Sequence, residues 1–225
     1  MSRVLFGFLL LCSGALAATP PDRAPQVLSL GRDLTYVRLV RLPADLPASS
    51  AAAARGSAIV DLRGTQSDDR GAQAIETWIH VHAKPSAPVF LLVNKATSPS
   101  LLDMIQTLRD SNLPLVCFGP ASLGNAVDVA VNTTDQEDRL ACEAIAKGSP
   151  LATLAAPAVT KVRHDEAELD RDLREGIRPD DSDDSDSQDL TAPEPKPPLV
   201  DLVLARAIQL NHALIALGRL PIRTP

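Results

Sequence analysis

The chain has 225 residues and a formal net charge of −6, with 45% hydrophobic residues but only 3% aromatic ones. This length is enough for one globular domain with a sizeable core. Residues 165–189 contain 12 acidic and 3 basic residues, so this one segment more than accounts for the net negative charge. Lys and Arg do not cluster with aromatic residues anywhere, so nucleic-acid binding has no support.

The first 17 residues have the pattern of a secretory signal peptide. Arg3 precedes an apolar run from Val4 to Leu11, and Ala15 and Ala17 supply small residues before a cleavage point. A buried N-terminal helix is the alternative. No later segment has the long uncharged run that a transmembrane helix requires. We therefore expect a signal peptide at 1–17 and export, to the periplasm or out of the cell, with no membrane span after cleavage.

Short apolar runs alternate with helical patterns through most of the chain that follows. Strands are predicted at 35–42, 57–62, 88–93, 115–118 and 127–131, and helices at 46–55, 71–82, 101–109 and 135–147. The last of these helices has Thr134 as its N-cap and Glu137 three residues later, which is a capping box. Strands that alternate with helices imply crossover connections and a mainly parallel sheet. The sequence therefore predicts a single α/β domain.

The composition changes sharply at Arg178. The segment RPDDSDDSDSQDLTAPEPKPP has almost no apolar residues, so we expect an acidic, proline-rich disordered linker at 177–198. An amphipathic helix follows at 199–217 and must bury its apolar face. These patterns divide the chain into a signal peptide, an α/β core at 18–176, the linker, and a C-terminal docking helix at 199–220.

Three motifs carry the functional interpretation. They are DLRGTQSDDRG from residue 61, LVNKATSPSLLDMIQTLRD from residue 92, and PLVCFGPASLGN from residue 114. Their order and spacing resemble those of the C-terminal processing peptidases, or tail-specific proteases. The final PLVDLVLARAIQLNHAL is similar to the closing D-x-x-L-x-x-A helix of that family. The resemblance implies the crotonase/Clp-protease-like fold, although residues 132–160 have no counterpart.

The turn that would bind the oxyanion departs from the family pattern. In these peptidases a DLRGNPGG-like turn brings backbone amides close to the substrate. Here Gly64 and Thr65 are followed by Ser67 and Asp68 in place of the glycine pair. A carboxylate at this place would repel the negative charge that develops during acyl transfer. The resemblance therefore argues against catalysis at this turn.

The nucleophile and base positions are also changed. Aligned without a gap, the position of the family's serine is Pro99, whose fixed φ suits the first turn of a helix. The position of the family's lysine is Asn125, and asparagine cannot accept the hydroxyl proton. Ser98 and Ser100 are alternative nucleophiles after a shift of one residue, although Ser98 also suits an N-cap. Lys95 and Lys147 are the nearest substitute bases in the sequence.

The sequence predicts an exported, non-catalytic peptidase-like protein that serves as a binding or structural module. By resemblance, an extended peptide or an exported protein would contact the two turns, at Gly64, Thr65, Ser67, Asp68, Ser98 and Ser100. The alternative is an active serine peptidase that uses Ser98 or Ser100 with an unrecognised base. An acyl-CoA enzyme of the wider crotonase class fits neither the export signal nor the altered turn. No cofactor is indicated.

The remaining candidate groups give no firm site. A disulfide between Cys117 and Cys142 would suit an oxidising compartment, whereas the apolar run around Cys117 favours a buried thiol. His80 and His82 would point apart on a helix, because residues two apart do not share a face. The acidic segment DDSDDSDSQD lacks the spacing of a calcium loop. We therefore predict no metal site.

Overall fold

The computed structural model describes residues 26–47, 56–155 and 198–221, and within them a six-stranded sheet. Its strands are β1 (Gln26–Ser29), β2 (Leu34–Arg38), β3 (Ser57–Asp61), β4 (Val89–Leu92), β5 (Leu115–Pro120) and β6 (Val129–Val131). They lie side by side in the same order as in the chain. β1 is antiparallel to β2, and every other neighbouring pair is parallel. The prediction of an α/β fold with a mainly parallel sheet is confirmed.

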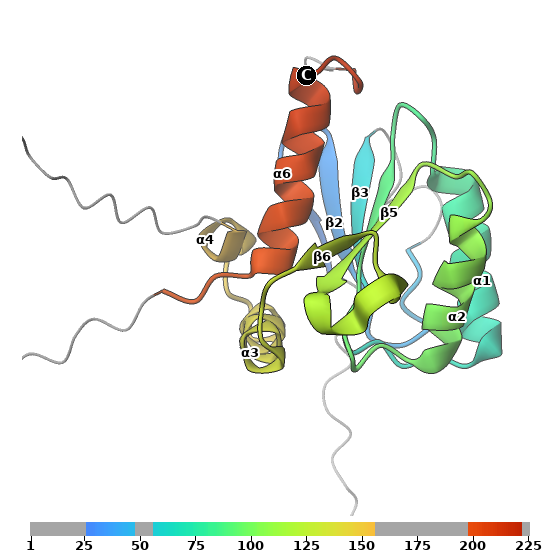
Figure 1. Ribbon diagram of the computed structural model, residues 1–225, viewed down its shortest axis with the longest axis horizontal. Helices are drawn as coiled ribbons and strands as arrows, with labels where there is room; N and C mark the ends of the chain where they lie inside the picture. The colour runs from blue at the N-terminus through green and yellow to red at the C-terminus, as the bar shows by residue number, and fades with distance from the viewer. Residues whose placement is uncertain (1–25, 48–55, 156–197, 222–225) are drawn as a thin grey trace, which may run out of the picture.

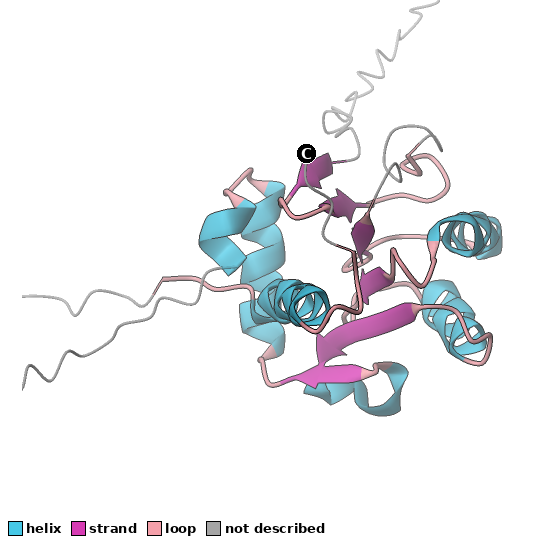
Figure 2. Ribbon diagram, turned by 90° about the horizontal axis from the view of Figure 1, so that it is seen from above, coloured by secondary structure: helices cyan, strands magenta, loops and turns pink. Residues whose placement is uncertain are grey.

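Helices cover both faces of this sheet, as Figures 1 and 2 show. One face carries α1 and α2; the other carries α3, α4 and α6. Their bounds are α1 (Asp69–His82), α2 (Pro99–Arg109), α3 (Asp135–Ala146), α4 (Leu151–Ala155) and α6 (Leu202–Ala216), with a 3-10 helix, η1, at Ala121–Ala126. The result is a three-layer arrangement in which parallel strands are buried on both sides. No helix in the described ranges is long and apolar enough to cross a membrane.

Alternate residues of each strand supply two separate cores. Val60 of β3 packs with α1 and α2, whereas its neighbour Ile59 faces the opposite layer. On that opposite side, Phe90 and Phe118 meet edge to face with ring centroids 6.0 Å apart, and Leu204 of α6 belongs to the same cluster. The C-terminal helix is thus docked on the sheet by its apolar face.

Helices α1, α3 and α6 each start at a residue whose side chain accepts a hydrogen bond from an amide of the first turn. Asp68 accepts a hydrogen bond from the Gly71 amide in α1, and Asp201 accepts one from the Leu204 amide in α6. Thr134 and Glu137 form the expected capping box of α3. These caps agree with the sequence prediction for α3 and place an aspartate at the start of both α1 and α6.

The structure differs from the predicted elements in several places. The predicted strand 35–42 ends at Arg38, because the chain then turns and the Asp45 carboxylate accepts from the amides of Val40 and Arg41. β1 and α4 were not predicted. Residues 48–55 of the predicted helix 46–55, the signal peptide and nearly all of the predicted linker lie outside the described residues.

Candidate functional site

The two turns singled out by the motifs lie against each other at the carboxyl edge of the sheet. One follows β3 and the other follows β4. The Ser98 amide donates to the Thr65 carbonyl at 3.2 Å, and the Gly64 amide donates to the Asn94 side chain at 3.2 Å. The Ser100 hydroxyl donates to the Ser67 carbonyl, also at 3.2 Å. The fold thus brings together the two turns that the resemblance assigns to one site.

Among the residues that the structure describes, no general base is a hydrogen-bond partner of Ser98 or Ser100. Ser98 is 7% exposed and precedes Pro99, the first residue of α2, but its hydroxyl caps no amide of that helix. Its oxygen lies 3.4 Å from the Ser100 oxygen, and Ser100 in turn contacts the Ser67 carbonyl. A hydroxyl or a carbonyl cannot serve as the proton acceptor that activates a serine.

The residues of the first turn are engaged in local structure. Thr65 is fully buried, and its hydroxyl donates to the Leu39 carbonyl at 2.8 Å. The Asp68 carboxylate is the N-cap of α1, with its oxygen 2.7 Å from the Gly71 nitrogen. Gly64 has a positive φ of 70°, which glycine adopts without strain. The turn is therefore shaped to start a helix and to pack against its neighbour.

Asn125 lies away from the serines. It is exposed, and its carbonyl accepts a hydrogen bond from Arg109, the last residue of α2. Pro99 is the first residue of that helix, and 11 helical residues rise by about 15 Å. The structure therefore does not place the base position beside the nucleophile position.

The two lysines named as substitute bases are in ion pairs on the surface. Lys95 Nζ is 2.6 Å from a carboxylate oxygen of Asp135, and Lys147 Nζ is 3.9 Å from one of Glu143. Each is more than half exposed. In the described structure both amino groups thus contact carboxylates rather than a serine hydroxyl.

The carboxyl edge of the sheet is organised around a buried arginine, Arg63. Its Nε and Nη2 donate to Asp61 at 2.9 and 2.8 Å, and its Nη1 and Nη2 donate to Asp201 at 3.0 and 2.8 Å. Nη1 also donates to Asp138 at 3.1 Å. The guanidinium has five N–H groups, and these five hydrogen bonds use all of them.

The partners of Arg63 come from three segments that are distant in the chain. Asp61 ends β3, Asp138 lies on α3, and Asp201 precedes α6. We call Arg63 and these three aspartates the arginine hub. Each member is at most 5% exposed. The hub therefore ties both helices to the end of the central strand.

Burial and the nearby positive charge have opposite effects on the pKa values of the hub aspartates Asp61 and Asp138. Burial raises the pKa of Asp61, but Arg63 and the Tyr36 hydroxyl, which donates at 2.7 Å, outweigh this and leave the pKa below its ordinary value. Asp138 differs: burial holds its pKa above the ordinary value despite donors from Arg63 and Asn94. Three carboxylates face one guanidinium, so the hub buries an excess of negative charge.

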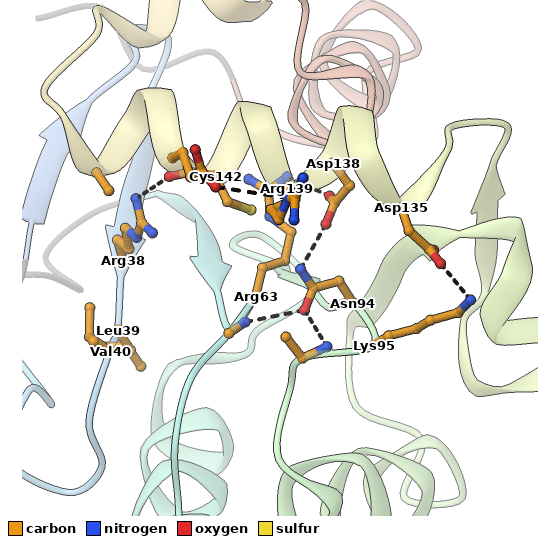
Figure 3. Close-up of a pocket in the computed structure, with 14 residues that line it drawn as sticks. Arg38, Leu39, Val40, Arg63, Asn94, Lys95, Asp135, Asp138, Arg139 and Cys142 are labelled. Carbon is orange, nitrogen blue, oxygen red and sulfur yellow. Dashed lines mark hydrogen bonds and ion pairs between the residues drawn. The ribbon is translucent and has the colours of Figure 1, made fainter.

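A groove lies between the strand ends and α3, above the hub (Figure 3). Its volume is about 370 Å³, and Leu39, Val40 and Ala146 supply apolar lining. Arg38 reaches across to α3, where it donates to the Cys142 carbonyl at 3.1 Å. Among the residues that the motifs predicted for binding, only Gly64 lines this groove.

Cys117 and Cys142 both have free thiols, so no disulfide joins them in this structure. Cys117 is buried in β5, and Cys142 is partly buried on α3 at the groove. Burial raises the pKa of each thiol to about 12. Thiols with such a pKa are protonated near neutral pH and react poorly as nucleophiles.

No group of His, Cys, Asp and Glu within the described ranges is arranged to hold a metal ion. His82 stacks on Trp78 with ring centroids 4.1 Å apart, and His80 lies 4.0 Å from Glu76. The two histidines thus have separate partners along α1.

No protein-family model, curated protein or solved structure matches this chain. The functional interpretation therefore depends on the motifs and on the geometry of the site.

The sequence motifs contained part of the arginine hub. Asp61 and Arg63 belong to DLRG, and Asp201 opens the closing D-x-x-L-x-x-A helix, but the motifs alone do not show that these side chains meet. Asp138 carried no signal, because it lies in a helix whose charged residues predict a surface position. Only the tertiary structure shows that it is 5% exposed.

Proposed function

We propose that the protein is an exported, non-catalytic relative of the tail-specific proteases, which binds an extended peptide or another exported protein or serves a structural role. This proposal depends on the hydrogen-bond partners of the Ser98 and Ser100 hydroxyls. Their hydroxyls contact each other and a backbone carbonyl, and the lysine position of the family, Asn125, lies at the far end of α2.

The chemistry of acyl transfer supports the same conclusion. A serine needs a base within hydrogen-bond reach to become a nucleophile. It also needs donors aimed at the developing oxyanion. Here the Asp68 carboxylate caps α1, and the Ser98 amide is bonded to Thr65. The Ser98 amide is thus used within the fold, and the Asp68 carboxylate is an acceptor that would repel an oxyanion.

The groove above the arginine hub is the part of the surface that best suits a ligand. In open α/β sheets, ligands bind outside the carboxyl ends of the strands, and this is an argument from fold alone. Arg38 and Arg139 provide charge, while Leu39 and Val40 provide apolar surface. A volume of about 370 Å³ falls at the lower end of the range for ligand sites.

Groove occupancy is testable with a matched pair of variants. Ala146 is partly buried and lines the groove, whereas Ala213 is exposed on α6. Anisotropy of a fluorescent library of unstructured peptides should rise with wild type and with Ala213→Trp, and should fall toward the free value with Ala146→Trp. Equal binding by both variants would remove the groove from the proposal.

The second candidate function is an active serine peptidase. Ser98 and Ser100 favour it, because both hydroxyls lie at the start of a helix beside the DLRG turn. A fluorophosphonate probe separates the two functions. We expect no labelling of the folded protein; labelling that is lost in Ser98→Ala or Ser100→Ala would establish the enzyme.

Export is part of the same proposal. The sequence pattern places cleavage after Ala17. Intact-mass measurement of the protein from its native host should give a chain that starts at Ala18. A cytoplasmic species that retains Met1 would contradict export.

A further inference from the structure

Four positively charged side chains line the groove above the arginine hub, and Arg38 is the one without a carboxylate partner among the described residues. The other three are bonded to carboxylates: Arg63 in the arginine hub, Lys95 by Asp135 at 2.6 Å, and Arg139 by Glu143 at 3.9 Å. Arg38 instead donates to the Cys142 carbonyl at 3.1 Å. The groove therefore contains one arginine whose charge no bonded carboxylate matches.

The guanidinium of Arg38 has donors left for a ligand. A guanidinium carries five N–H groups, and the bond to Cys142 uses one of them. The Asp61 carboxylate attracts Arg38, but its oxygens already accept hydrogen bonds from Arg63 and Tyr36. Arg38 is partly buried where it lines the groove (Figure 3). A partly buried guanidinium with unused donors favours a bound anion.

The rest of the groove restricts the kind of anion. Leu39 and Val40 follow Arg38 along the chain and line the same groove, and Val40 is 41% exposed. A ligand that fits this surface has an apolar group beside its charge. The arginine hub below holds three carboxylates against one guanidinium, so it repels a doubly charged phosphate more strongly than a singly charged carboxylate.

We propose that the groove binds an acidic peptide, in which an Asp or Glu side chain pairs with the Arg38 guanidinium and a neighbouring apolar side chain packs on Leu39 and Val40. This inference rests on the proposed function, because it specifies which kind of peptide the groove holds. A guanidinium and a carboxylate form two parallel hydrogen bonds, which an ammonium does not reproduce. Arg139 lies on the other wall, and its exposed, 3.9 Å contact with Glu143 leaves it free to turn toward the same carboxylate.

Fluorescence anisotropy with three labelled peptides tests this inference. The peptides are unstructured, acetylated and amidated, share a frame of alanine and valine, and differ only in a central Glu, Gln or Lys. Wild type should bind the Glu peptide about tenfold more tightly than the Gln peptide at low salt. This preference should shrink as the salt concentration rises, since the groove is open to solvent.

Variants of Arg38 show whether this side chain causes the preference. Arg38→Met should lower the affinity for the Glu peptide to that for the Gln peptide. Arg38→Lys should keep part of the preference, because it retains the charge but loses the paired donors. Arg206→Met, at an exposed site on α6, should bind as wild type does. Thermal melts should show that the variants fold, and the comparison of peptides on wild type needs no variant.

The outcomes separate this inference from groove binding itself. Equal binding of the Glu and Gln peptides by wild type, abolished by Ala146→Trp, would overturn the inference and leave the groove as the site. Tighter binding of the Lys peptide would overturn it by showing that the hub attracts cations. A preference for Glu that survives in Arg38→Met would overturn it too, as would binding that needs a free C-terminal carboxylate instead of the Glu side chain. Failure of every peptide to bind would overturn both the inference and the groove as a peptide site.

Discussion

Replacement of Arg63 by methionine should destabilise the protein more than any surface substitution. The side chain is fully buried, and its five hydrogen bonds of 2.8–3.1 Å all end on carboxylates. Methionine fills similar volume but donates no hydrogen bond. Asp61, Asp138 and Asp201 would then remain buried with no cation among them.

The magnitude follows from the cost of an unpaired buried charge. Removal of one partner from a buried ion pair costs about 3–5 kcal/mol. A domain has about 5–15 kcal/mol of total stability. For a domain of this size, 1 kcal/mol lowers Tm by about 2–4 °C. We therefore expect Tm to fall by roughly 6–20 °C, or folding to fail.

The assay is thermal and urea unfolding followed by circular dichroism, with Arg206→Met as the matched control. Arg206 is exposed on α6, where it donates a long hydrogen bond of 3.4 Å to Gln209, so its loss should change stability by less than about 0.5 kcal/mol. Combining Arg63→Met with Asp201→Asn should cost less than the sum of the two single changes. Equal effects of Arg63→Met and Arg206→Met would refute the hub as the tie between strand and helices.

Three further results are expected. Burial raises the pKa of Asp138, so its contribution to stability is fully present below its ordinary pKa of 3.8 and is lost as the pH rises through the raised value. In urea unfolding, the free energy of unfolding of Asp138→Asn should therefore increase relative to that of wild type as the pH rises from 4 toward 7. A pH profile parallel to that of wild type would contradict this. Burial raises the pKa of Cys142 to about 12, so iodoacetamide should alkylate this thiol roughly a thousandfold more slowly in the native state than in urea. Mass spectrometry would measure both rates, and equal rates would contradict the burial of Cys142. The Asp201 amide donates to the Leu154 carbonyl at 2.8 Å, so the described residues on either side of 156–197 lie close together. Replacement of residues 157–197 by a short Gly-Ser linker should therefore leave Tm nearly unchanged, and a large loss of Tm would show that this segment contributes to the core.

The sequence predicted the alternation of strands and helices because each buried strand is a clear apolar run. SAIVDL and PVFLLV could be located without knowledge of their neighbours, and β3 and β4 lie where these runs predict. The helix at 71–82 and the capping box at Thr134 were equally local signals. Strands, helices and caps that depend on residues close in the sequence were therefore largely predictable.

Features that depend on distant residues were not predictable. β1 has only two apolar residues in four, and becomes a strand because it hydrogen-bonds to β2. Asp138 resembles any other acidic residue of a charged helix, and its burial follows only from contact with Arg63 and Asn94. One side of the groove is formed by α3, whose sequence has no counterpart in the motifs.

The proposal that this protein lacks the catalytic groups of a serine peptidase is tested most directly by hydrolysis of unstructured peptides. Wild type and Pro99→Ser should both give no turnover, because a serine at position 99 would still lack a base. Adding Asn125→Lys should not restore activity either, since Asn125 lies near Arg109 at the other end of α2. Turnover by wild type that is abolished by Ser98→Ala or Ser100→Ala would contradict the claim.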